Sequence, residues 1–513
     1  MKKEMSGKMQ TAVNMFASML TYVITMLISF FLSPYIVKNI GVDANGFIGL
    51  ANNFINYASL ITIALNALAG RFITISIYQN NYKAANKYFS SVFFSNAFLS
   101  LIIAIIGTVI VTFLNSFIDV SDQLLPDVRL LFALLFINCI IGTLDSVFSV
   151  ATFARNKLYL NSLRSIESNI MRIICIVMLF SFFTPKLFYV AIASILASSY
   201  CLIVNIFYTK KLLPEIKLSH RSFDFKMVKE LVAGGIWSLI NRLGQILLDG
   251  LDLLITNVFI NSVSMGMLSI SKTIPSAING IVGNIVSIFS PNFTILYAQK
   301  KNDELLKNIK QSMKIMGVIT NIPVIVLIIC GKDFYALWQP TVDASVLYKL
   351  SLLSCGCIII SGGINCLYDI FAVVNKLRAN SLVVIFTGCL NALIVFILLK
   401  TTDLGIYAVA GVSTTISIFR NLLFTVPYGA KCLNLKWYTF YPDVVRPLLY
   451  VLSTVGVCFL TVSKFAAGSW ILLVVKGIMT VSVSFLIGYF VVLSKNERTV
   501  IKRIVKSKIR KNR

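Results

Sequence analysis

Long apolar runs, separated by short polar segments, extend along the whole chain of 513 residues. The runs are continuous rather than alternating every second residue, and each is about 20 residues long, which indicates membrane-spanning helices and not barrel strands. Fourteen spans are predicted, near residues 13–33, 47–69, 89–114, 130–151, 167–183, 188–208, 231–256, 267–290, 313–330, 348–373, 381–399, 406–425, 447–463 and 470–493. We therefore expect an all-α integral membrane protein.

The basic residues predict the orientation of these spans. With an even number of spans both termini lie on one side, and most of the 46 Lys and Arg fall in segments on that side. Because Lys and Arg are retained in the cytoplasm, we expect both termini there. The first run has no small-residue cleavage site after it, so we expect it to remain as a span. The net charge of +26 is spread over separate inner segments, which favours contact with anionic lipids over nucleic acid.

A short polar phrase occurs twice in the chain. Residues 156–163 read NKLYLNSL and residues 375–382 read NKLRANSL. At nearly the same shift, residues 72–79 resemble residues 292–299, and Gly46 corresponds to Gly266. Each match falls at the same place in a six-span count, which predicts a tandem duplication.

The duplication predicts the organisation of the chain. Two six-helix lobes of the same orientation are expected at 1–215 and 216–430, related by an axis along the membrane normal. Helices 13 and 14, within 431–493, and a basic cytoplasmic tail at 494–513 lie outside the repeat. A cleft between the two lobes is the simplest geometry.

Polar residues inside the spans form stripes, and lipid cannot solvate them. In span 7 the stripe is Ser238, Arg242, Gln245, Asp249, Asp252 and Thr256, at steps of three or four residues. In span 8 it is Lys272, Ser276, Asn279, Gly283 and Ser287. Spans 1 and 2 offer neutral groups, among them Asn14, Asn52 and Asn56. We expect these stripes to face the cleft.

The charged members of these stripes have alternative roles. Arg242 and Lys272 would contact an anionic ligand, or Arg242 would pair with Asp249 and only hold helices together. Asp249 or Asp252 would tune the cations, bind a coupling ion such as Na⁺ or H⁺, or do both.

Other charged residues are weaker candidates. Asp145 shares a face with Asn138 and Gly142 and either lines the cleft or packs helices. For Asp369 and Arg420 a structural pair or a headgroup contact is the alternative to a ligand contact. Arg71 is a substrate contact or a snorkelling anchor, whereas Arg172 and Lys476 are interpreted as anchors.

The sequence lacks the groups that metal, cofactor or nucleotide chemistry needs. His220 is the single histidine, and the ten cysteines are scattered without a CxxC pair. No glycine-rich phosphate loop occurs, and the outer loops are too short for a catalytic domain. We expect no cofactor and no built-in ATPase.

The first eighty residues carry a recognisable pattern: Asn14 in span 1, Pro34-Tyr35 at its end, Gly41 followed by Gly46, and Arg71 in GRFITI. With the span count, this resembles the multidrug/oligosaccharidyl-lipid/polysaccharide exporter superfamily, and in particular its polysaccharide-repeat-unit flippases of the O-antigen and capsule type. The span pattern covers nearly the whole chain, whereas the motif covers only this part.

The resemblance implies alternating access in a bacterial cytoplasmic membrane. The implied cargo is an undecaprenyl-pyrophosphate-linked oligosaccharide, and the implied partners are membrane lipids and polysaccharide assembly proteins. Lipid II flippases look arginine-rich in spans 1 and 2, whereas these spans carry no internal charge here, which argues against a peptidoglycan precursor. The alternatives are a cation-coupled drug exporter of the same superfamily and a membrane enzyme of polysaccharide assembly.

Overall fold

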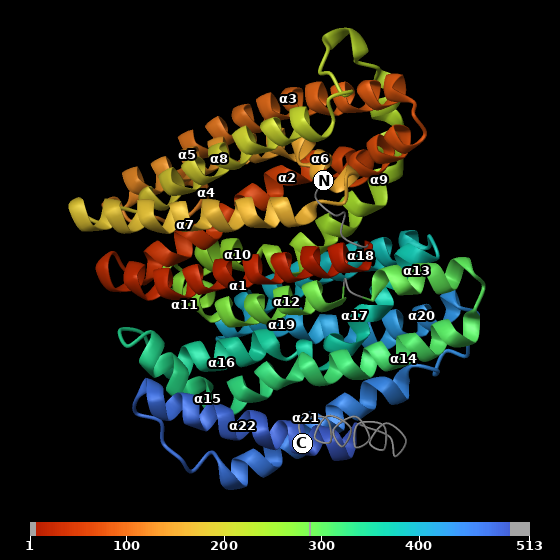
Figure 1. Ribbon diagram of the computed structural model, residues 1–513. Coiled ribbons are helices and arrows are strands. Elements are labelled where there is room, and N and C mark those ends of the chain that lie inside the picture. The colour runs from red at the N-terminus through yellow and green to blue at the C-terminus, as the bar shows by residue number, and fades with distance from the viewer. Residues whose placement is uncertain (1–6, 287–288, 493–513) are drawn as a thin grey trace, which may run out of the picture. The chain divides into compact units, whose positions relative to one another are not determined.

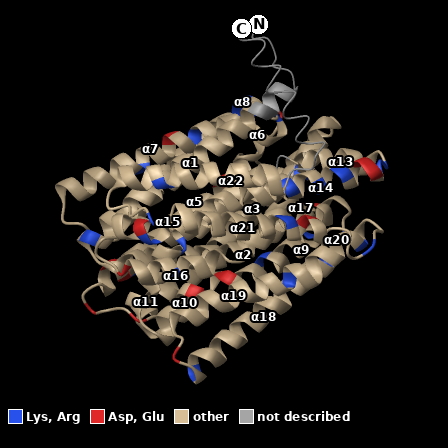
Figure 2. Ribbon diagram, turned by 90° about the horizontal axis from the view of Figure 1, so that it is seen from below, with Lys and Arg blue, Asp and Glu red and all other residues tan. Residues whose placement is uncertain are grey.

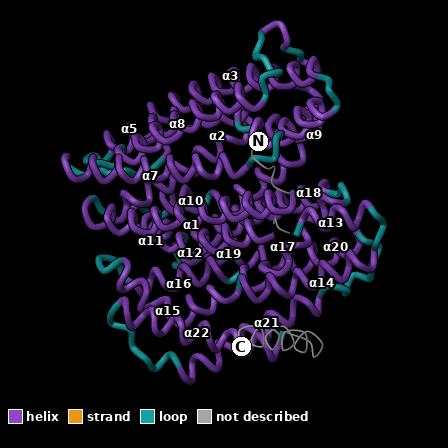
Figure 3. Tube along the Cα trace, in the orientation of Figure 1, coloured by secondary structure: helices purple, strands orange, loops and turns teal. Residues whose placement is uncertain are grey.

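The computed structural model describes residues 7–286 and 289–492, and every regular element in this part of the chain is helical (Figure 3). The described part of the chain contains fourteen candidate spans that are long and apolar enough to cross a membrane, and several of them comprise two or three consecutive helices. The prediction of an all-α membrane protein with fourteen spans is confirmed. Charged residues are sparse along these helices (Figure 2), as a bilayer core that cannot solvate ions requires. The predicted basic tail and Ser287 lie outside the described residues.

The chain divides into two compact units. Unit 1 comprises Met1–Ile270 and Arg378–Val409. Its helices, labelled in Figure 1, are α1 (Gly7–Asn39), α2 (Val42–Tyr78), α3 (Tyr82–Thr112), α4 (Leu114–Phe117), α5 (Leu125–Phe148), α6 (Val150–Ala154), α7 (Leu158–Phe182), α8 (Tyr189–Leu212), α9 (Phe225–Gln245), α10 (Asp252–Phe259), α11 (Ser262–Ser271) and α18 (Leu377–Thr401). A 3₁₀ turn (His220–Ser222) precedes α9, and a π-helical segment (Ile246–Gly250) follows it.

Unit 2 comprises Ser271–Leu377 and Ala410–Arg513. Its helices are α12 (Thr273–Val286), α13 (Ser290–Ala298), α14 (Asn302–Ile319), α15 (Asn321–Trp338), α16 (Ala344–Cys355), α17 (Ile358–Val373), most of α19 (Ile406–Arg420), α20 (Val426–Cys432), α21 (Tyr441–Thr461) and α22 (Trp470–Val491). A second π-helical segment (Asn421–Thr425) joins α19 to α20. Unit 1 thus holds the first six predicted spans together with spans 7 and 11. The division into two six-helix lobes of the same orientation stays a prediction.

The phrase that the sequence repeats forms the same turn in both places. Asn156 and Asn375 have φ angles of 52° and 55°, in the left-handed region that asparagine tolerates better than most residues. In each copy the N–H of the following lysine bonds to a carbonyl five residues back, at 2.7 and 2.8 Å. This hydrogen bond ends one helix and lets the next begin at once. The same turn also forms at Asn434, outside the repeated phrase, so the tandem duplication stays a prediction.

Glycines bring α2, α9 and α18 into close contact within unit 1. A Cβ atom added at Gly235 in α9 would lie 2.0 Å from the carbonyl oxygen of Ala64 in α2. A Cβ atom at Gly388 in α18 would lie 2.7 Å from the carbonyl oxygen of Gly244 in α9. Small residues permit such backbone contacts between membrane helices, where van der Waals packing rather than the hydrophobic effect drives association.

Helices α21 and α22 pack onto α15 within unit 2. Lys476 of α22 is 3% exposed and donates a hydrogen bond to the carboxylate of Asp333 in α15, at 2.8 Å. The interpretation of Lys476 as a membrane anchor is therefore wrong. A sequence pattern does not reveal a partner that lies 143 residues away.

Candidate binding cavity and intramembrane charges

Unit 1 contains a cavity of about 340 Å³ between α2, α5, α7 and α8. Its walls are polar for a membrane-spanning region and include Asn52, Asn138, Asp145, Asn169, Arg172 and three serines. Aliphatic side chains complete the lining. Because lipid would not solvate these groups, the cavity has the composition of a site for water or a polar ligand.

Helical periodicity aims these side chains at one space. On α5 the lining residues are Leu135, Asn138, Gly142 and Asp145, and on α8 they are Val190, Ser194, Ala197, Ser198 and Cys201. Steps of three and four residues put each set on one face of its helix. Helix α5 packs against α8 and α2, and α7 packs against α8, so these faces meet.

The cavity unites residues that the sequence analysis treated separately. Asn52, predicted to bind substrate, lies in the same lining as Asp145, which was a weaker candidate. Arg172, interpreted as an anchor, also lines this cavity, and that interpretation is corrected. The signal for it was Ser168, Asn169 and Arg172 on one turn of α7, beside the serine face of α8.

The two charges in the cavity do not neutralise each other. Among the described residues, Arg172 forms no ion pair, and its buried Nε–H has no hydrogen-bond partner. Asp145 accepts hydrogen bonds from the amide of Asn205, at 2.9 and 3.2 Å. The buried Oδ1 of Asn138 also lacks a partner within the described part of the chain. A charged side chain in mid-span costs about 2.5–3.5 kcal/mol on insertion scales, so Arg172 needs a compensating role.

Arg242 lies half-buried on α9, and Gln245 and Asp249 beyond it are exposed. Its guanidinium donates to Oε1 of Gln245 at 3.3 Å, and within the described residues it forms no ion pair with Asp249. The structural alternative, in which Arg242 only pairs with Asp249, is therefore absent from this conformation. Contact of Arg242 with a substrate stays a prediction.

The predicted stripe of span 7 is regular only as far as Asp249. The π-helical segment contains one extra residue per turn, closed by a hydrogen bond from Leu251 N–H to the Ile246 carbonyl at 3.0 Å. The face therefore rotates, and Asp252 is 1% exposed whereas Asp249 is exposed. The ideal helical period predicted that the two carboxylates share one accessible face, and in the structure they do not.

Side chains from neighbouring helices satisfy the carbonyls that the π-helical segment frees. Asn53 and Tyr57 of α2 both donate to the Gly250 carbonyl, Asn53 at 3.1 Å. Asn391 of α18 donates to the Leu248 carbonyl at 2.8 Å. Freed backbone groups at membrane depth need such partners because no lipid atom replaces them. The irregular segment is thus built into the packing of unit 1.

The candidates in unit 2 have diverse surroundings. Lys272 is half-buried and Asn279 is exposed. Arg420 donates to the hydroxyl of Tyr368 at 3.2 Å. Among the described residues neither Arg420 nor Asp369 forms an ion pair, and the buried Oδ2 of Asp369 lacks a hydrogen-bond partner. A structural role, a headgroup contact and a ligand contact all stay predictions for these two residues.

The remaining predicted residues lie in unit 1. Asn14 is 6% exposed, and its Oδ1 accepts from Tyr159 N–H at 2.8 Å, while its amide donates to Asn156 Oδ1 at 3.2 Å. The side chain thus braces the first copy of the repeated turn. Asn56 and Arg71 are exposed. Contact of these three residues with substrate stays a prediction.

A polar cluster next to the cavity was not predicted. Arg164 pairs with Glu167 on α7 at 2.6 Å, and Tyr200 of α8 bonds to both. The i, i+3 spacing of Arg164 and Glu167 was a readable signal for this pair. Arg164 is thus neutralised by a neighbour on its own helix, whereas Arg172 is not.

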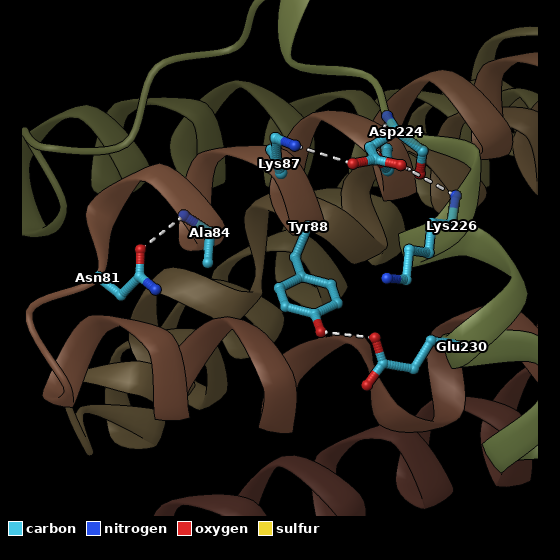
Figure 4. A network of polar contacts seen from close by, with 8 residues as sticks. Asn81, Ala84, Lys87, Tyr88, Asp224, Lys226 and Glu230 are labelled. Atoms are coloured by element: carbon cyan, nitrogen blue, oxygen red, sulfur yellow. Dashed lines mark hydrogen bonds and ion pairs between the residues drawn. The ribbon is translucent and has the colours of Figure 1, made fainter.

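The segment between α8 and α9 is anchored on the start of α3 (Figure 4). Lys87 donates to the Asp224 carboxylate at 2.9 Å, and Tyr88 donates to Glu230 at 2.9 Å. The hydrogen bond from Lys87 and the Lys226 N–H lower the pKa of Asp224 below its usual value. These contacts attach α9, which carries Arg242, to the first helices of unit 1.

The described residues hold no group of three or more His, Cys, Asp or Glu side chains placed to bind a metal ion.

Residues 40–337 match the family described as "Polysaccharide biosynthesis protein". The match covers more than half of the chain. The chain belongs to this family. A curated relative, "Uncharacterized membrane protein EpsK" from Bacillus subtilis (strain 168), is 26% identical over 502 residues, which make up 98% of this chain and 99% of the relative.

Solved structures show that this family member has the fold of multidrug and lipid transporters. A structure described as "Lipid II flippase MurJ, inward closed conformation" matches with a TM-score of 0.66 and 15% identity, over 93% of this chain and 99% of the other. An inward-facing multidrug resistance MATE family transporter of the MOP superfamily matches with a TM-score of 0.63 and 12% identity, over 82% of this chain and 98% of the other. The resemblance is thus confirmed at the level of the fold.

Proposed function

We propose that the protein is a flippase that moves undecaprenyl-pyrophosphate-linked oligosaccharide repeat units from the cytoplasmic to the outer leaflet. It works by alternating access and serves the biosynthesis of a surface polysaccharide of the O-antigen or capsule type. It is a transporter and not an enzyme. It resides in the bacterial cytoplasmic membrane with both termini in the cytoplasm.

The joint match to a polysaccharide biosynthesis family and to the fold of a lipid flippase carries this proposal. The flippase match extends over 93% of this chain, whereas the match to the inward-facing multidrug transporter extends over 82%. A flippase therefore accounts for more of the chain than a drug exporter does. The drug exporter remains the second candidate because its fold matches almost as well.

The chemistry of the cargo fits the residues available. A pyrophosphate carries two negative charges and needs cations in a region of low dielectric constant, a role for Arg242 and Lys272. Sugar hydroxyls need neutral donors and acceptors, which Gln245, Asn279 and Asn56 supply. The polyprenyl tail stays in the bilayer beside lipid, so only the headgroup needs a polar path. Asp249 or Asp252 couples transport to Na⁺ or H⁺.

Export in cells tests the proposal. Deletion of the gene should remove the surface polysaccharide and leave its lipid-linked repeat unit accumulated on the inner leaflet. Arg242→Ala and Lys272→Ala should fail to restore export at wild-type protein levels, whereas the control Lys301→Ala, at an exposed position, should restore it. If both variants restore a normal amount of surface polysaccharide, Arg242 and Lys272 are not needed for transport.

The coupling role has a separate test. Flipping in proteoliposomes should respond to an imposed proton or sodium gradient, and the response should be lost in Asp249→Asn or Asp252→Asn. A flipping rate that ignores both gradients would exclude ion coupling through these carboxylates.

A further inference from the structure

The cavity in unit 1 has the size of a small-ligand site. Its volume of about 340 Å³ lies near the lower end of the range of about 300–1,000 Å³ seen for pockets that bind small molecules. This space holds one or two sugar rings and not a whole repeat unit. Its ligand is therefore a part of a larger cargo or a small molecule.

The unsatisfied groups in the cavity specify what that ligand must offer. Arg172 supplies a positive charge and a buried N–H donor that has no partner among the described residues. Asn138 presents a buried oxygen acceptor, likewise without a partner, and Asp145 receives hydrogen bonds from Asn205. A complementary ligand thus carries one anionic group for the guanidinium and hydroxyl donors for the oxygens.

We propose that this cavity binds a sugar residue that bears a carboxylate, with the carboxylate on Arg172 and the ring hydroxyls on Asn138 and Asp145. The inference rests on the proposed function and deepens it, because it makes the transported glycan acidic. The cavity then acts as a selectivity site for the glycan, within unit 1 alone.

Other ligand classes fit these groups less well. Inorganic phosphate offers acceptors to Arg172 and a few hydroxyl donors, but it fills little of a cavity of about 340 Å³. A neutral sugar supplies the donors but leaves the guanidinium without a counter-charge. An amino sugar brings a second cation next to Arg172. A sugar that carries a carboxylate meets both demands, through the planar pairing that arginine makes with carboxylates.

The experiment titrates the purified full-length protein, in detergent, with glucuronate, glucose or inorganic phosphate, and follows binding by the shift in unfolding temperature. Glucuronate should bind at least tenfold more tightly than glucose or phosphate. Arg172→Gln should weaken glucuronate binding at least tenfold, and Arg172→Lys should weaken it less. Arg164→Gln, on the same helix but paired with Glu167, should leave it unchanged.

A second variant keeps the test decisive if Arg172→Gln does not fold. Gly142 lines the cavity, and a Cβ atom added there would meet nothing within 4 Å, so Gly142→Leu should place its side chain in the cavity space. It should abolish glucuronate binding. Gly456→Leu, at an equally open position of α21 in unit 2, should not.

The outcomes separate this inference from the proposed function. Equal affinity for glucuronate and glucose, equal affinity for phosphate and glucuronate, or unchanged binding in Gly142→Leu overturns the inference. Wild-type protein that flips a lipid-linked oligosaccharide but does not bind glucuronate also overturns it and leaves the proposed function intact. If the protein binds glucuronate selectively but flips no such lipid, the inference about the cavity's ligand is supported and the proposed function is contradicted.

Discussion

Replacing Arg172 by methionine should stabilise the protein and abolish its transport. The guanidinium forms no ion pair among the described residues, and its buried Nε–H is unsatisfied. Methionine keeps the unbranched apolar stem that packs along α7 and removes the charge. A group that a ligand requires, but that the empty protein does not compensate, lowers the stability of the fold.

The size of the gain follows from the surroundings of Arg172. An arginine at the centre of a span costs about 2.5–3.5 kcal/mol on insertion scales. The side chain is half-buried and lines a polar cavity, so water screens part of this charge. We therefore expect Arg172→Met to raise the free energy of unfolding by about 1–2 kcal/mol, which is less than the full insertion cost.

Unfolding of the purified protein in mixed micelles, with increasing SDS content, measures this difference. Export of polysaccharide in a deletion strain that carries the variant measures the loss of transport. A variant that is less stable than wild type by 1 kcal/mol or more would refute the reasoning, because it would mean that the folded protein already compensates the charge.

Three further predictions concern contacts outside the cavity. Asp333→Asn leaves the ammonium of Lys476, whose side chain is 4% exposed, without its counter-ion and should lower the free energy of unfolding by about 3–5 kcal/mol. Lys476→Met leaves a carboxylate that is 31% exposed and should lower it by about 1–2 kcal/mol in the same micelle assay. Equal losses in the two variants would contradict this prediction. The pKa of Asp224 is lower in the folded protein than in the unfolded chain. The stability advantage of wild type over Asp224→Asn should therefore be constant at neutral pH and should shrink as the pH falls below about 4. An advantage that is unchanged between pH 7 and pH 3 would contradict this prediction. Gly235→Ala puts a methyl group 2.0 Å from a carbonyl oxygen of α2 and should lower stability by about 1–3 kcal/mol, whereas Gly477→Ala, which meets nothing within 4 Å, should not.

The span architecture was predictable from the sequence because hydropathy acts locally. Each span must supply its own apolar length, so the fourteen runs correspond to the fourteen candidate spans in the described part of the chain. The helix ends were less predictable. Helix α2 runs from Val42 to Tyr78, beyond the predicted 47–69, because backbone hydrogen bonds continue past the apolar part. The repeated phrase was visible in the sequence, whereas the left-handed conformation of Asn156 and Asn375 follows only from the backbone.

The candidate site was predictable only in part because its groups meet through tertiary packing. Asp145 was found by its spacing on α5, because it shares a helical face with Asn138 and Gly142. Arg172 was interpreted as a membrane anchor because the sequence shows a single charge in this span. Only the packing of α7 against α8 shows that this charge lines a cavity. The rotation between Asp249 and Asp252 escaped the ideal period of 3.6 residues because it depends on a π-helical segment stabilised by α2 and α18.

The most direct measurement is the flipping of a lipid-linked oligosaccharide by the purified protein in proteoliposomes. An undecaprenyl-pyrophosphate-linked repeat unit, taken from the deletion strain, is placed in both leaflets and probed from outside with a glycan-modifying enzyme. With wild-type protein the enzyme should reach nearly all of the lipid, whereas with empty liposomes or Arg242→Ala it should reach about half. Access limited to the outer leaflet with wild-type protein would contradict the account.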